Sequence, residues 1–214
     1  MVERKDDCMG KVIITGPGRS GTSFLVQLLT RLGLDTGFEA YNEDYDPKIR
    51  AGCEWIVHVD FNHPKERIKS ILDNAPRVLK SPEWGLELKR LVRGGYMNVD
   101  YVLIPVRDLE QAATSRLNVG LDWKMPEGQP KGNERIALQA EVLALALGRA
   151  VEACLMEHLP CQLIEFPLFV QNEKYCWRKL KDVLEGIERK RFTEEWTKLA
   201  KPEQIGQWQR KSNP

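Results

Sequence analysis

Apolar and polar residues alternate along the chain with two different periods, which predicts strands and helices in succession. Short apolar or β-branched runs predict strands, at residues 11–15, 77–81, 100–107 and 161–166. Longer segments with apolar residues at helical spacing predict helices, at residues 21–33, 64–75, 82–95, 108–118, 134–158 and 172–199. Residues 54–61 fit either a strand or part of a helix. This alternation predicts an α/β fold of three layers, in which helices cover both faces of a central parallel sheet.

Two long segments carry neither period. Residues 34–53 are rich in acidic and turn residues and predict an exposed loop. Residues 119–133, heavy in glycine and proline, are typical of a lid or binding loop, with disorder as the alternative. The 214 residues fit a single domain, in which residues 1–10 and 200–214 are candidate flexible tails.

Composition and charge narrow the class of protein. The formal net charge of +1 gives no overall field to attract nucleic acid or an anionic membrane, so neither partner is expected. Five well-separated cysteines without a C-x-x-C pair favour reduced thiols and hence a reducing compartment. The chain begins without the apolar core of a signal peptide, and its apolar run at 142–148 is far shorter than the roughly 18 residues of a membrane span. A soluble, cytoplasmic protein is therefore expected.

The stretch "ITGPGRSGTSFL", which begins at residue 14, joins the first predicted strand to the first predicted helix. Ligands of parallel sheets bind at the carboxyl ends of the strands, where the backbone N–H groups of Gly18 to Ser23 can point inward as an anion-binding nest. A tight turn with a Ser or Thr helix cap is the alternative, but it does not explain why an arginine and three hydroxyl side chains crowd together here. The triphosphate-binding pattern G-x-x-x-x-G-K-[ST] requires lysine after Gly21, where this chain has Thr22.

The segment "GPGRSGTSFLVQLL" resembles the 5′-phosphosulfate-binding loop of the sulfotransferases that use 3′-phosphoadenosine 5′-phosphosulfate (PAPS), a family with a P-loop-type phosphate-binding turn. The resemblance implies that Arg19 is the loop cation and that Thr22 and Ser23 are the paired hydroxyl ligands. The other loop residues that it implies are Gly18, Ser20 and Gly21. Phe24 falls where some members place an aromatic ring over the adenine, although core packing explains it equally well.

Two further segments resemble motifs of this family. In "VLIPVRDLEQAATSRL", a strand-end arginine is followed eight residues later by a serine, which implies that Arg107 and Ser115 bind the 3′-phosphate of PAPS. In "RVLKSPEWG", Lys80 matches a family lysine that reaches the sulfuryl group, with a solvated strand-end lysine as the alternative. Some relatives place a catalytic histidine two positions after this lysine, and Pro82 excludes a histidine base there.

A general base is needed to take the proton of an acceptor hydroxyl. Glu39 follows Arg19 by twenty residues, and relatives with an arginine in the loop carry a glutamate base at a similar distance. Glu39 is therefore the predicted base. The alternatives are Glu43, Glu83 and His58, and plain solvation explains any single glutamate of this acidic loop.

The resemblance implies a sulfotransferase that moves a sulfuryl group from PAPS to a hydroxyl or amine and releases adenosine 3′,5′-bisphosphate (PAP), without a metal. A transferring sulfuryl group carries less negative charge than a phosphoryl group, so hydrogen bonds and cations can replace the Mg²⁺ of kinases. A P-loop small-molecule or nucleoside kinase and a catalytically silent nucleotide-binding module are the alternative hypotheses.

The acceptor is expected to be a small molecule or a glycan. The predicted acceptor loops carry aromatic residues that permit a sugar, a phenol or a peptide, namely Tyr41, Tyr45, Trp55 and Trp123. The segment "IGQWQRK" near the C-terminus is a candidate lid over the nucleotide. The sequence does not indicate the oligomeric state.

Overall fold

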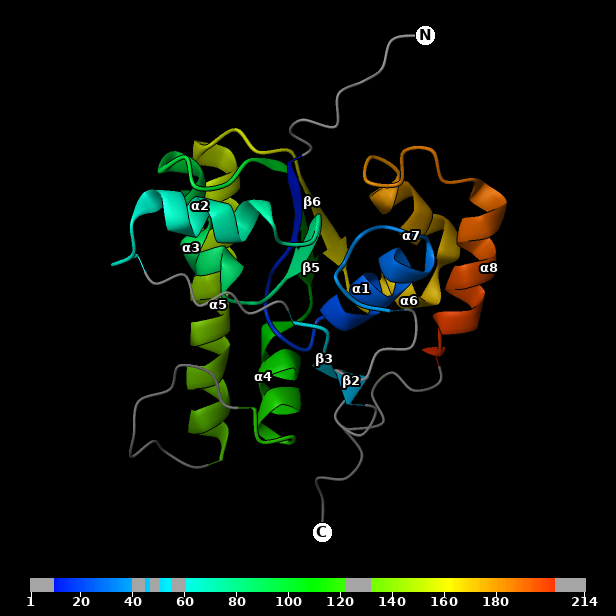
Figure 1. Cartoon of the computed structure of the whole chain (residues 1–214). Helices are drawn as coiled ribbons and strands as arrows, with labels where there is room; N and C mark the ends of the chain where they lie inside the picture. The colour runs from blue at the N-terminus through cyan, green and yellow to red at the C-terminus, as the bar shows by residue number, and fades with distance from the viewer. Residues whose placement is uncertain (1–9, 40–44, 47–50, 55–60, 122–131, 203–214) are drawn as a thin grey trace, which may run out of the picture.

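The computed structural model describes residues 10–39, 45–46, 51–54, 61–121 and 132–202, and it shows an α/β fold (Figure 1). Its main sheet has four strands in the order β4-β1-β5-β6, and every pairing in that sheet is parallel. The strands are β1 (Lys11–Ile14), β4 (Val78–Lys80), β5 (Val99–Val106) and β6 (Cys161–Glu165). The α/β class and the parallel sheet predicted from the hydrophobic pattern are thus confirmed.

The helices follow the predicted segments, except that the single helical segment predicted at residues 172–199 is divided into two helices by residues 181–188. They are α1 (Thr22–Arg31), α2 (Lys65–Asp73), α3 (Trp84–Arg93), α4 (Leu109–Leu117), α5 (Asn133–Met156), α6 (Leu168–Gln171), α7 (Glu173–Leu180) and α8 (Arg189–Leu199). The short helix α6 was not predicted, because its four residues make only about one helical turn and cannot show a repeating pattern. Among the described helices, none is both long and apolar enough to cross a bilayer.

Two hydrophobic cores lie on opposite faces of the sheet. Alternate residues of a strand point to opposite faces, and accordingly Val12 and Ile14 enter one core while Ile13 enters the other. The first core packs the sheet against α1, α7 and α8, and the second packs it against α2, α3 and α5. Figure 1 shows these two groups of helices on either side of the strands, so the protein has three layers.

The segment predicted as an exposed loop, residues 34–53, is partly buried, and that prediction is wrong in two places. Thr36 and Cys53 are each only 1 % exposed, and the strands β2 (Tyr45–Asp46) and β3 (Ala51–Gly52) form a small antiparallel pair within it. Isolated buried residues in a polar segment produce no period, so the sequence pattern could not reveal them. Residues 55–60 of the ambiguous 54–61 segment lie outside the described residues.

Candidate functional site

The turn between β1 and α1 lies at the carboxyl ends of the parallel strands. Its backbone takes left-handed conformations, with φ of 143° at Gly16, 69° at Arg19 and 83° at Gly21. A Cβ atom on Gly21 would lie 2.6 Å from Cζ of Phe169 and 2.7 Å from Cδ2 of Phe166, so the turn rests directly on these two rings. Positive φ at a non-glycine residue such as Arg19 costs about 1–3 kcal/mol and is concentrated at functional sites.

Helix α1 begins directly after this turn with a terminus that the described side chains leave uncapped. Gly21 occupies the N-cap position without a side-chain hydrogen bond, and the first turn of the helix contains no acidic residue. The Ser20 hydroxyl instead donates to the Pro17 carbonyl, and the Ser23 hydroxyl donates to the Gly52 carbonyl at 3.0 Å. The N–H groups at a helix N-terminus and the positive end of the helix dipole together favour an anion at this position.

Arg19, Arg107 and Ser115 meet beside the turn. The Nε atom of Arg19 donates to the Ser115 hydroxyl on α4 at 3.1 Å, and Nη1 of Arg107 at the end of β5 donates to the Arg19 carbonyl at 3.2 Å. Burial lowers the pKa of Arg107, although its neighbour Asp108 opposes that shift. The structure therefore brings together the loop arginine and both members of the predicted strand-end pair.

Arg116 also belongs to this group, and sequence reasoning missed it. The residue is only 9 % exposed, and its Nη1 atom lies 1.9 Å from where a Cβ atom of Gly18 would stand. A side chain at position 18 would therefore displace the guanidinium from its place against the turn. Burial lowers the pKa of Arg116, and the charge of Glu54 raises it in part.

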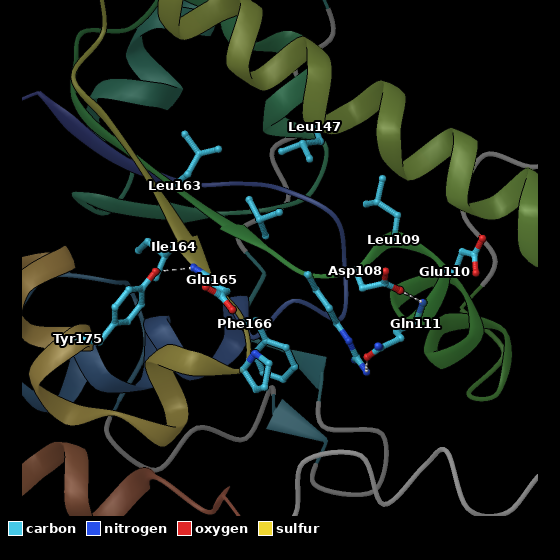
Figure 2. Close-up of a pocket in the computed structure, with 13 residues that line it drawn as sticks. Asp108, Leu109, Glu110, Gln111, Leu147, Leu163, Ile164, Glu165, Phe166 and Tyr175 are labelled. Atoms are coloured by element: carbon cyan, nitrogen blue, oxygen red, sulfur yellow. Dashed lines mark hydrogen bonds between the residues drawn. The ribbon is translucent and has the colours of Figure 1, made fainter.

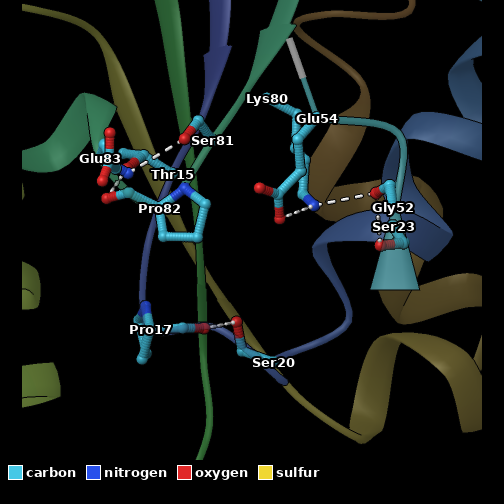
Figure 3. Close-up of polar contacts among 10 residues, drawn as sticks. All are labelled: Thr15, Pro17, Ser20, Ser23, Gly52, Glu54, Lys80, Ser81, Pro82 and Glu83. Atoms are coloured by element: carbon cyan, nitrogen blue, oxygen red, sulfur yellow. Dashed lines mark hydrogen bonds and ion pairs between the residues drawn. The ribbon is translucent and has the colours of Figure 1, made fainter. Parts of the chain in front are cut away.

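Lys80, at the end of β4, is buried beneath the opposite side of the turn. The side chain is 3 % exposed, and its ammonium donates to the Gly52 carbonyl at 3.0 Å and to Oε1 of Glu54 at 2.8 Å (Figure 3). Burial lowers the pKa of Lys80, and the Glu54 carboxylate raises it in part. This location contradicts the alternative of a solvated strand-end lysine. Glu54 was not among the candidate residues, because nothing in the sequence links it to Lys80.

The predicted bases lie in different surroundings. Glu39 is exposed. It comes two residues after Gly37, which packs against Pro76 just before the start of β4. Lys80 stands at the other end of that strand, and the carboxylate that the structure places beside it is Glu54. Glu83 occupies the N-cap position of α3. The role of Glu39 stays a prediction, while Glu43 and His58 lie outside the described residues.

An open pocket of about 770 Å³ lies at the carboxyl ends of β5 and β6 (Figure 2), and Arg107 is one of the residues that line it. Apolar walls come from Leu109, Leu147 and Leu163. The Arg107 guanidinium lies 5.2 Å from the centre of the Phe166 ring, which also lines the pocket. Arg107 therefore connects the pocket to the glycine-rich turn.

Phe24, the candidate adenine neighbour, is half-buried against the first hydrophobic core. Its ring centre lies 5.7 Å from that of Phe169. Packing in the core accounts for this placement. The candidate lid at residues 205–211 and most of the 119–133 loop lie outside the described residues.

The chain was compared with protein-family models and with curated proteins, and it matches none of them. Within the described part of the chain, no group of three or more His, Cys, Asp or Glu side chains is arranged to hold a metal ion. The interpretation of the site therefore depends on its geometry and on the motifs of the sequence.

Proposed function

We propose that the protein is a sulfotransferase that transfers a sulfuryl group from PAPS to a hydroxyl or amine acceptor. One observation carries the proposal. The N-terminus of α1, which the described side chains leave uncapped, converges with Arg19, Arg107 and Ser115 at one end of a parallel sheet. These are the groups that the sequence motifs assign to the two phosphate-bearing ends of PAPS.

The residues present are chemically suited to such a donor. PAPS is anionic at both its 3′-phosphate and its phosphosulfate, and the site offers backbone N–H groups, hydroxyl groups and four cationic side chains, namely Arg19, Lys80, Arg107 and Arg116. The pocket volume of about 770 Å³ lies within the range of small-molecule sites, roughly 300–1,000 Å³. Because Arg107 lines the pocket, a nucleoside whose 3′-phosphate met that arginine would lie in or beside the pocket.

Each group then has a defined task in the transfer. The bond between sulfur and the donor's bridging oxygen breaks, a bond between sulfur and the acceptor oxygen or nitrogen forms, and negative charge develops on the leaving oxygen. Arg19 and the buried Lys80 would stabilise that charge, and they act more strongly where water is excluded. Thr22 and Ser23 would bind the 5′-phosphate. The acceptor's proton would pass to a carboxylate, and Glu39 remains the predicted one.

Calorimetric titration with PAP and with ATP plus Mg²⁺ tests the proposal. We expect PAP to bind without Mg²⁺, and Arg107→Ala to weaken it about 10- to 100-fold, which corresponds to one lost charged hydrogen-bonding group. Arg149→Ala, an exposed arginine on α5, is the matched control and should bind PAP as the wild type does. Tighter, Mg²⁺-dependent binding of ATP would contradict the proposal and favour a kinase.

A catalytically silent nucleotide-binding module is the second candidate. It is favoured by the contacts of Lys80, whose ammonium is held by Gly52 and Glu54. If Arg19→Ala abolishes sulfuryl transfer while PAP binding is largely retained, the silent module is ruled out. If the wild type binds PAP but transfers no sulfuryl group to any of a panel of phenols, amines and sugars, the silent module is supported.

A further inference from the structure

Residues 52–54 fill hydrogen-bonding positions that an anionic ligand of the turn would use. The Gly52 carbonyl accepts hydrogen bonds from the Ser23 hydroxyl and from the Lys80 ammonium, both at 3.0 Å. The Glu54 carboxylate accepts a second hydrogen bond from Lys80 at 2.8 Å. Figure 3 shows these oxygens facing Lys80 and Ser23 beside the turn. Oxygen atoms of the protein itself are thus bound to two side chains that the proposed function gives to the donor.

The negative charge of Glu54 likewise takes the place of the charge of an anionic ligand. Lys80 is 3 % exposed and Arg116 is 9 % exposed, and the charge of Glu54 acts on both of them. A buried cation requires an opposite charge nearby, because its loss of hydration is otherwise uncompensated. In the protein described here, Glu54 supplies that charge to two cations of the site.

The two groups of this segment differ in their freedom to move. The Gly52 carbonyl belongs to a backbone that the adjacent Cys53, 1 % exposed, anchors in the first hydrophobic core. The Glu54 side chain is 34 % exposed and can turn into solvent without opening the core. The Gly52 carbonyl can therefore keep Lys80 in position while the carboxylate leaves.

We propose that Glu54 is a built-in competitor for the anion at the glycine-rich turn: its carboxylate pairs with Lys80 until an anionic ligand takes its place. The site then favours ligands that bring enough negative charge to displace a carboxylate, such as a phosphate or phosphosulfate dianion, over neutral nucleosides. This inference rests on the proposed function for the identity of the nucleotide.

The test compares PAP binding by the wild type, Glu54→Gln and Glu66→Gln in calorimetry. Glu54→Gln keeps the shape of the side chain but removes its charge, and we expect PAP to bind about 10- to 100-fold more tightly, the equivalent of one charged hydrogen bond. Glu66→Gln changes the net charge equally on the exposed surface of α2 and should leave the affinity unchanged. Adenosine, which carries no phosphate, should show no gain from Glu54→Gln.

Each outcome decides a different point. If the wild type binds PAP and Glu54→Gln binds it equally or less tightly, Glu54 supports the site and the competitor is refuted, while the proposed function stands. If Glu54→Gln binds PAP and the wild type does not, the result supports the proposal that Glu54 competes with the ligand, because its carboxylate then blocks binding completely. If neither protein binds PAP, both proposals fail. Should Glu54→Gln not fold, Glu54→Asp provides the same test, because a shorter carboxylate pairs less well with Lys80 and should give a smaller gain in affinity.

Discussion

Replacing Gly21 with alanine should destabilise the protein more than any glycine substitution in open space. The backbone at Gly21 has a φ of 83°, which costs an alanine about 1–2 kcal/mol. The new Cβ atom would also lie 2.6 Å from Phe169 and 2.7 Å from Phe166, both below normal contact distance. Forcing an extra methyl group into a packed site costs about 1–3 kcal/mol. We therefore expect the free energy of unfolding to fall by about 2–5 kcal/mol.

Gly120→Ala separates the two contributions. Gly120 has a similar φ of 69°, but a Cβ atom there would meet nothing within 4 Å. Its alanine variant should lose only the backbone cost of about 1–2 kcal/mol. Equilibrium urea unfolding measures both variants, and an unchanged m-value would show that the unfolded state is not the cause. If Gly21→Ala is no less stable than Gly120→Ala, the contact of the turn with the two phenylalanine rings does not limit the size of residue 21.

Three further predictions concern the site and the core. Ser115→Ala removes the acceptor of the Arg19 Nε hydrogen bond and should weaken PAP binding in calorimetry by about 5- to 10-fold, the equivalent of one hydrogen bond. Unchanged binding would contradict the role of Ser115 as a ligand of the 3′-phosphate. Lys80→Met keeps the volume of the side chain and removes its charge. The rate of sulfuryl transfer should fall about 100- to 1,000-fold, while the urea midpoint should change little. A normal transfer rate would exclude Lys80 from the reaction. Burial raises the pKa of the Cys176 thiol from an ordinary value of 9.0 to about 12, so the folded state holds that proton more tightly than the unfolded state. The resulting stability is complete below pH 9 and is lost as the pH rises toward 12. Urea unfolding between pH 8 and pH 11 should therefore show a flatter pH dependence in Cys176→Ala than in the wild type, and an identical slope would refute this assignment.

The sequence predicted the parts of the site that depend on local pattern. Strand ends and helix starts are marked by glycine, proline and hydroxyl residues, so the turn at Arg19 and the strand-end residue Arg107 could be placed before the structure was known. The eight-residue spacing between Arg107 and Ser115 put both side chains at the same end of the sheet. In the structure, both of them form a hydrogen bond with Arg19. Their roles toward a ligand remain predictions.

Arg116 and Glu54 could not be predicted, for two different physical reasons. An arginine on a helix is exposed in most proteins, whereas Arg116 is buried, with its guanidinium in the space that the missing side chain of Gly18 leaves. Glu54 meets Lys80 across a sequence separation of 26 residues. No local period connects such positions, because the contact depends on how a polar segment crosses the end of the sheet.

The order of the strands places the charged side chains of the site on two sides of the glycine-rich turn. Strand β1 lies between β4 and β5, so the turn that follows it has Lys80 on one side and Arg107 on the other. Lys80 pairs in register with Ile14, the last residue of β1, so it stands beside the start of the turn. The pocket of about 770 Å³ opens on the β5 and β6 side. Under the proposed function the nucleoside binds on that side, and Lys80 acts on the leaving oxygen from the β4 side. Substitutions at Arg107 should then act mainly on nucleotide affinity, and substitutions at Lys80 mainly on the rate of transfer, because the proposed function assigns Lys80 to the charge that develops on the leaving oxygen.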